Sequence, residues 1–126
     1  MAYASAYRYL CTGLNTVLAR EGVAVGNTAG YPRVEIHDYT EQQPADKGAA
    51  VRVVSAVVES ISAVSPEEAE QMNAANLPLI ATLPDSEAFH LVGAVPQQLT
   101  ETTEATDTAP ALYRVLQTID FYIQQL

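Results

Sequence analysis

A long run of β-branched residues, followed at once by a helix start, constrains the fold more than any other feature. Residues 49–64 (AAVRVVSAVVESISAV) are rich in valine and isoleucine, which favour extended strands. The run predicts one long strand that bends or carries a bulge. Ser65-Pro66-Glu67-Glu68 then places serine at a helix N-cap, proline at the first helical position and glutamate at the third. The Ser65 hydroxyl can accept from the Glu68 amide, and the Glu68 carboxylate can reach back to the Ser65 amide.

The helix that begins at Pro66 is expected to lose its regularity before its apolar stripe ends. The stripe continues through Ala69, Met72, Asn76, Leu79 and Leu83. Pro78 has no amide hydrogen, and it disfavours helical backbone at the residue before it. We therefore predict a regular helix to about residue 76 and a second short turn that reaches Leu83.

The N-terminal third predicts a helix, a loop and a strand. Residues 2–20 place apolar side chains at intervals of three or four, with Gly13 inside the pattern and Gly22 after it as a stop. A mid-helix glycine costs ~1 kcal/mol relative to alanine, which points to a packing reason for Gly13. Residues 22–30 are typical of a loop or short hairpin element, and residues 33–39 alternate as a half-buried strand does.

Polar connections separate the remaining strands. Residues 40–48 (TEQQPADKG) predict a turn or exposed loop. Residues 89–95 predict a strand in which Gly93 marks a bulge. Residues 99–110 (LTETTEATDTAP) are rich in threonine and acid, so we expect a mobile connection there. Residues 112–126 alternate again and predict a closing strand.

The predicted order is helix, strand, strand, helix, strand, strand. Its fold class is α+β, in a two-layer sandwich with a mostly antiparallel four-stranded sheet and two main helices packed on one face. The chain of 126 residues suits a single domain over residues 1–126. The other sheet face carries mixed polar side chains and could face water or a partner.

Charge is scarce in this chain, and most of it is acidic. Charged residues make up 17% of the sequence, and six basic against fifteen acidic residues give a net charge of -9. The single lysine, Lys47, and the scattered arginines do not form the basic cluster that nucleic acid or an anionic membrane needs. We therefore expect no direct nucleic-acid binding and no membrane binding. A surface so short of charge is a first indication of a protein interface.

Cysteine usage and hydropathy point to the cytoplasm at synthesis. Cys11 is the single cysteine, so no internal disulfide can form. It lies beside the apolar stripe of the first predicted helix, where a free cysteine behaves as a small hydrophobe. The sequence has no run of ~18 apolar residues and no basic-then-apolar leader.

The segment Glu35-Ile36-His37-Asp38 comes nearest to a metal site. On a strand, Glu35 and His37 point to one side and Asp38 to the other, so only two ligands converge. Zinc takes three or four protein ligands, and His90 lies on a separate predicted strand. We expect no metal and no cofactor at these residues.

No motif predicts catalysis. The glycines at 22, 26 and 30 have neither phosphate-loop nor dinucleotide spacing. The acidic residues have simpler explanations, as helix-start charges (Glu67, Glu68, Glu70) or as part of a solvated loop (Glu101, Glu104, Asp107). An enzyme would need His37, His90 and distant carboxylates to meet, so we assign no catalytic residue.

Tyrosine is over-represented among the aromatic residues, with seven tyrosines against two phenylalanines and no tryptophan. Tyrosine suits the borders of interfaces, because its ring is apolar and its hydroxyl polar. Tyr3, Tyr7 and Tyr9 cannot all face one core. Ordinary half-buried tyrosines and an interface both remain open as explanations.

The arrangement as a whole resembles the phage tail-terminator (tail-completion, minor tail protein U-like) family. The matching stretches are the N-terminal helix, YPRVEIHDY, AAVRVVSAVVESISAV, SPEEAEQMNAAN, FHLVGAVPQQL and ALYRVLQTIDFYI. The resemblance rests on element order over nearly the full chain, and no single motif is diagnostic. The threonine-rich loop of the last hairpin and Pro78 in the second helix depart from the pattern.

The resemblance implies a structural protein encoded by a phage or prophage, located in the virion tail. Such proteins form a homo-oligomeric ring, commonly a hexamer, which caps the tail tube and joins it to the head side; tail-tube and head-completion proteins are the partners. No cofactor and no reaction belong to this role. The ring would use heterologous contacts, for which the closing strand and residues 99–110 are candidates. The alternative is a small α+β module that binds a ligand or peptide.

Overall fold

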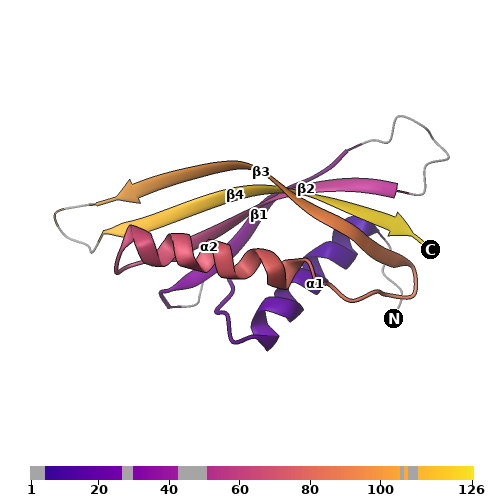
Figure 1. The fold of residues 1–126 in the computed structure, drawn as a ribbon, viewed down its shortest axis with the longest axis horizontal. Helices are drawn as coiled ribbons and strands as arrows, with labels where there is room; N and C mark the ends of the chain where they lie inside the picture. The colour runs from indigo at the N-terminus through magenta and orange to yellow at the C-terminus, as the bar shows by residue number, and fades with distance from the viewer. Residues whose placement is uncertain (1–4, 27–29, 43–50, 106, 108–110) are drawn as a thin grey trace.

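The computed structural model describes residues 5–26, 30–42, 51–105, 107 and 111–126, and within them two helices cover one face of a four-stranded sheet (Figure 1). In chain order the elements are α1 (Ala6–Arg20), β1 (Arg33–Gln42), β2 (Val51–Ser62), α2 (Pro66–Ile80), β3 (Phe89–Glu104) and β4 (Leu112–Gln125). The strands lie in the order β1-β2-β4-β3, and all neighbours are antiparallel. The predicted α+β fold and element order are confirmed.

The first helix begins and ends at recognisable sequence signals. Ser5 is the N-cap of α1, and its side chain accepts a hydrogen bond from the amide of Arg8 at 3.1 Å. Gly22 follows the helix with a φ of 81°, which glycine adopts at little cost, and its amide donates to the carbonyl of Ala19. The predicted stop is confirmed, whereas residues 2–4 of the predicted helix lie outside the described part of the chain.

The predicted start of the second helix is confirmed, with one change in its hydrogen bonds. The Ser65 hydroxyl accepts from the amide of Glu68 at 3.1 Å. The Glu68 carboxylate does not reach back to the Ser65 amide but accepts from the hydroxyl of Ser62 at 2.6 Å. The Ser62 oxygen in turn accepts from the Ser65 amide at 3.2 Å. Ser62, at the end of β2, thus links the start of α2 to the sheet by hydrogen bonds.

The prediction that α2 ends near residue 76 was wrong, because the helix continues through Pro78 to Ile80. Proline removes one helical hydrogen bond. Packing offsets this loss, because the Ile80 side chain is fully buried and those of Leu77 and Leu79 pack against the core. The last turn of the helix therefore packs against the core, and Pro78 lies on its exposed side.

Two strands are longer than the sequence predicted. Residues 99–104 are not a mobile connection, because they extend β3 and pair with β4 from Leu99 opposite Gln117 to Glu104 opposite Leu112. Residues 40–42 likewise extend β1, where a loop over 40–48 was predicted; residues 43–48 lie outside the described residues. In both cases the neighbouring strand supplies backbone hydrogen bonds, and these require no apolar side chains.

Bulges occur in the two edge strands, whereas the sequence predicted that the long central strand bends or carries a bulge. β2 pairs with β4 without a register shift from Val51 to Ser62. β1 shifts register between His37 and Thr40, where Asp38 has a φ of 56°. β3 shifts between Leu91 and Gly93, as predicted, and again between Pro96 and Leu99. The edge strands absorb the irregularity, and the central pair stays regular.

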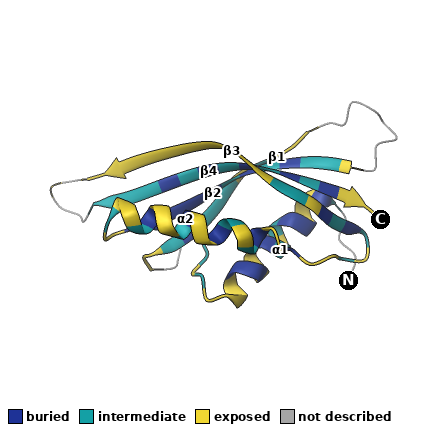
Figure 2. Cartoon of the chain, in the orientation of Figure 1, coloured by how far each residue is buried: buried dark blue, intermediate teal, exposed yellow. Residues whose placement is uncertain are grey.

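The apolar core lies between α1 and the sheet, and Figure 2 shows the buried stripe along this helix. The core is made largely of Tyr9, Leu10, Leu14, Leu18, Val54, Val58, Ile119, Phe121 and Ile123, with Ile80 and Leu83 from the end of α2 and the loop after it. Gly13 sits against Leu83, and a Cβ at this position would lie 2.5 Å from the Leu83 Cδ1 atom. The packing reason expected for Gly13 is therefore this close approach.

The middle of α2 meets the sheet through polar residues, in contrast to α1. We call Ser60, Ser62, Asn73, Asn76 and Gln117 the polar layer; all five are buried. The Asn73 side-chain amide donates to the Gln117 side-chain carbonyl at 3.4 Å. Three buried atoms have no hydrogen-bond partner among the described residues: Ser60 Oγ, Asn73 Oδ1 and Asn76 Nδ2. The contact between α2 and the sheet is therefore less apolar than the contact between α1 and the sheet.

Candidate interaction surfaces

A charged cluster spans the sheet face that is turned away from the helices. Glu59 is its centre, because the next residue in β2, Ser60, points into the polar layer and successive side chains alternate. One Glu59 oxygen lies 2.7 Å from the Nε2 atom of His37 in β1. The other accepts a hydrogen bond from the guanidinium of Arg114 in β4. Arg114 also lies 3.6 Å from Glu104 in β3, so all four strands contribute.

Glu59 is only 7% exposed, and its charge is balanced by its neighbours. Burial on its own lowers the pKa of His37, but hydrogen bonds and charge from Glu59 and Asp38 outweigh that effect and raise it. The hydrogen bond to Glu59 raises the pKa of Arg114 against the opposing effect of burial. Glu59 therefore favours the protonated form of both neighbours, and the cluster ties edge strand β1 to central strands β2 and β4.

The residues considered for a metal site do not come together. Glu35 pairs with Arg33 at 2.8 Å, while His90 pairs with Asp85 at 2.6 Å. Asp38 was predicted to point away from His37, but the bulge in β1 turns its carboxylate to within 3.1 Å of the His37 Nδ1 atom. In the described part of the chain, no three histidine, cysteine or acidic side chains are grouped so as to hold a metal ion.

Cys11 lies half-buried on α1, next to the side chains of Asn15 and Tyr39. Burial, followed by the proximity of Cys11, raises the pKa of Tyr39 well above its ordinary value. The Tyr39 ring also meets that of Tyr7 edge-on, with 5.1 Å between the ring centroids. This thiol is part of the contact between α1 and β1, consistent with the small hydrophobe predicted from sequence.

The tyrosines of α1 divide between core and surface. Tyr9 is 2% exposed, and its hydroxyl donates to the carbonyl of Pro84 at 3.0 Å. Tyr7 is 43% exposed at the contact with Tyr39. Tyr3 lies outside the described residues. One of the two described tyrosines thus has an ordinary core role, and the other borders a surface.

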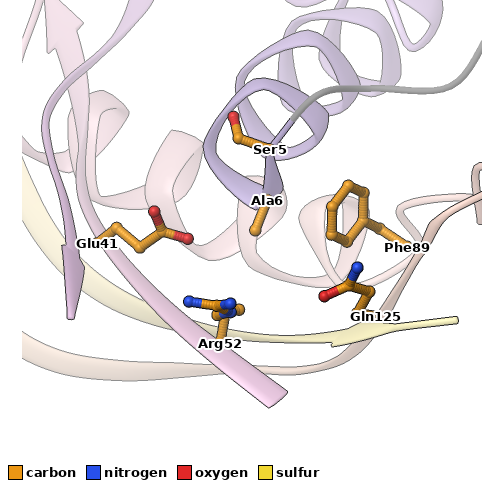
Figure 3. Close-up of a pocket in the computed structure, with 6 residues that line it drawn as sticks. All are labelled: Ser5, Ala6, Glu41, Arg52, Phe89 and Gln125. Atoms are coloured by element: carbon orange, nitrogen blue, oxygen red, sulfur yellow. The ribbon is translucent and has the colours of Figure 1, made fainter. Parts of the chain in front are cut away.

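A polar hollow of about 260 Å³ opens at the start of α1 (Figure 3). Its lining comes from five elements and the N-cap of α1: Ser5, Ala6, Glu41, Arg52, Phe89 and Gln125. Arg52 forms no ion pair with any residue that the structure describes, although the side chain of Glu41 lines the same hollow. The exposed Arg8, one turn into α1, is likewise without an ion pair among the described residues. This end of the molecule therefore presents two available cations.

The outer half of β3 is acidic, in contrast to the arginines at the start of α1. Residues Val95–Glu104, which we call the β3 overhang, are exposed at every position although they form a strand. Val95 and Leu99 are 43% and 52% exposed, respectively. Glu101 lines a small groove with Pro66 of α2, and its hydrogen bond to Glu70 raises the pKa of Glu70. Glu101 and Glu104 are strand residues and not part of the solvated loop predicted for them.

Sequence reasoning missed Glu59, Arg114 and Arg52 as candidate residues. Glu59 was detectable in principle, because an acidic residue inside a valine-rich strand needs a partner when it is buried. Its partners could not be named, because they depend on which strands are neighbours and on their register.

No helix among the described residues has the length and apolar character needed to cross a bilayer. No protein-family model and no curated protein sequence matches the chain. A search of solved structures does find a similar fold, in a chain of the virion of a native gene transfer agent particle. The TM-score is 0.64 at 20% sequence identity, and the match covers 98% of this chain and 99% of the other. The two chains therefore share a fold.

Proposed function

We propose that this protein is a structural subunit of a phage-like virion, and that it acts as a tail terminator. In this role, copies of the chain form a ring that caps the tail tube and joins it to the head side. The proposal assigns the chain no reaction. Its partners are further copies of itself, the tail-tube protein and a head-completion protein.

One observation carries this proposal: the likeness to a virion chain extends over both proteins from end to end. The two chains share only 20% identity, so the likeness supports a common architecture and not any particular contact. The resemblance of the element order to tail terminators supplies the specific role. The low charge content and the exposed β3 overhang suit a subunit whose surface is covered in an assembly.

Locating the chain in particles tests the proposal directly. Particles made by the encoding element should bind an antibody against the chain at the junction of head and tail. Deletion of its gene should give tails of uncontrolled length that do not join heads, which electron microscopy would reveal. Normal particles from the deletion strain, or particles that lack the chain, would overturn the proposal.

The polar hollow at the start of α1 supports a second candidate, a module that binds a small ligand or a peptide (Figure 3). Ligand sites are usually apolar with a few polar groups, whereas Phe89 is the only large apolar residue among those that line this hollow. Calorimetric titration with small carboxylates and with acidic peptides would test it. Binding that is lost in Arg52→Ala would favour this second function.

A further inference from the structure

We infer that the β3 overhang of one subunit docks against the start of α1 in a second copy of this chain, in a head-to-tail contact. In each contact, the β3 overhang of one copy binds the start of α1 in the next copy. The inference rests on the proposed function, because a ring of identical subunits needs one heterologous contact that repeats.

No other described element covers the β3 overhang. A strand of a two-layer sandwich normally buries one face, yet every residue from Val95 to Glu104 is exposed. Two apolar side chains, those of Val95 and Leu99, are included in this exposed run. Because β3 is also an edge strand, the outer half of β3 is open on both faces and along one edge.

The β3 overhang and the start of α1 carry complementary charges. α2 and β3 contain no lysine or arginine, and Glu101 is held close to Glu70 across the groove between these elements. α1 contains Arg8 and Arg20 and no acidic residue. Opposite charges on two surfaces attract and fix the orientation of a contact, and like charges disfavour the wrong orientation. A second copy therefore offers a cation to Glu101, whereas Glu104 already lies 3.6 Å from Arg114 of its own subunit.

The two surfaces lie toward opposite ends of the molecule (Figure 1). Figure 1 shows the arrowhead of β3 at one end of the long axis and the start of α1 toward the other end. Arg8 and Arg52, neither of them paired among the described residues, lie at that second end. Complementary surfaces at opposite ends of a subunit cannot pair within one molecule, and they generate a repeating chain or a closed ring.

Two charge-reversed variants test this contact in trans. Glu101→Arg places a cation on the overhang, and Arg8→Glu places an anion at the start of α1. Each variant alone should self-associate about tenfold or more weakly than the natural chain, because the junction then joins like charges. An equal mixture should recover association with the two chains alternating, because both junctions are again between opposite charges.

Neither variant is expected to unfold the subunit. Glu101→Arg removes the contact between two carboxyl groups at Glu70, and Arg8→Glu places an acidic residue in the first turn of α1, which the helix dipole favours. Glu21→Arg is the matched control, because it makes the same charge change at an exposed residue after α1 and should associate as the natural chain does.

Native mass spectrometry with one chain isotopically labelled would count the two subunits in each oligomer. Alternating oligomers in the mixture, and weaker association at high salt, are the expected results. The inference falls if Glu101→Arg associates as the natural chain does, if the mixture fails to recover, or if the natural chain stays monomeric at millimolar concentration. Particles that contain the chain would keep the proposed function in each of these cases, whereas particles without it would remove that function whatever the mixing experiment gives.

Discussion

The two helices cover the same sheet in different ways. α1 buries Leu10, Leu14, Val17 and Leu18 against the apolar part of the sheet, whereas α2 buries Ala69, Asn73, Asn76 and Ile80. Only Ile80, at the end of α2, belongs to the main core among these α2 residues. Apolar burial is therefore concentrated beneath α1, whereas the contact of α2 relies on polar groups whose hydrogen bonds are only partly satisfied.

This division has a functional sense under the proposed assembly. The polar layer lies beneath α2, which also lines the groove beside the β3 overhang, so one of the two surfaces of the proposed contact adjoins this layer. The other surface, at the start of α1, adjoins the apolar core. Regions of low local stability are common where proteins must adjust to a partner.

The largest expected effect is at the centre of the α1 contact. Leu14→Ala removes a fully buried side chain and leaves a cavity, so it should lower the free energy of unfolding by about 2–5 kcal/mol. Urea denaturation followed by circular dichroism would measure this change. Thr12→Ala, at an exposed position of the same helix, should change stability by less than about 0.5 kcal/mol. A small effect of Leu14→Ala would break the comparison.

The second prediction concerns the close contact of α1 with Leu83. Gly13→Ala should destabilise the protein by about 1–3 kcal/mol, because the new Cβ would lie 2.5 Å from the Leu83 Cδ1 atom and Leu83 is buried. In a Leu83→Ala background the same change should stabilise by up to about 1 kcal/mol, because alanine is the better helix former. A double-mutant cycle would reveal this reversal of sign. Equal effects in both backgrounds would contradict the packing explanation.

The third prediction concerns the polar layer and a much smaller energy. Asn76→Ala removes a buried amide whose nitrogen has no hydrogen-bond partner among the described residues, and alanine also favours the helix. The free energy of unfolding should therefore change by less than about 1 kcal/mol. The same urea experiment as for Leu14→Ala makes the two helices directly comparable. A loss as large as that of Leu14→Ala would show that the polar layer is well satisfied.

The smallest expected effect is the pH dependence of stability that arises from the charged cluster around Glu59. Folding raises the pKa of His37, so the protonated ring adds stability that is fully present below pH 6.5 and is lost as the pH rises through the folded pKa. The free energy of unfolding should thus decrease slightly from pH 6 toward pH 8. His37→Gln should flatten this part of the profile. An unchanged slope in that variant would assign the dependence to another group.

The sequence predicted elements well where the signal was local. The cap at Ser65 and the stop at Gly22 depend on neighbouring residues, and both were located correctly. Pro78 misled the prediction, because the burial of Ile80 is a tertiary effect that no local pattern contains. Residues 99–104 misled it for a related reason, because a polar strand is stabilised by the backbone of β4 and not by its own side chains.

The candidate surfaces were less predictable than the fold. In the charged cluster, His37 is 22 residues and Arg114 is 55 residues from Glu59 in the sequence. The cluster therefore forms only when the strands pair in the folded register. Asp38 was assigned to the wrong side because the bulge at that residue interrupts the alternation on which the assignment depended. The arginine of the hollow, Arg52, carried no local signal at all.

The bulges of the edge strands limit how this sheet can grow. β1 loses register near its middle, and β3 does so twice, with Pro96 offering no amide along its edge. A strand from a neighbouring molecule would therefore find only short stretches with regular spacing. Molecules crowded together at an assembly site are protected from stacking into an endless ribbon, the route by which exposed strands form amyloid. The irregular edge strands thus disfavour backbone pairing between molecules, and contacts with a neighbour depend on side chains.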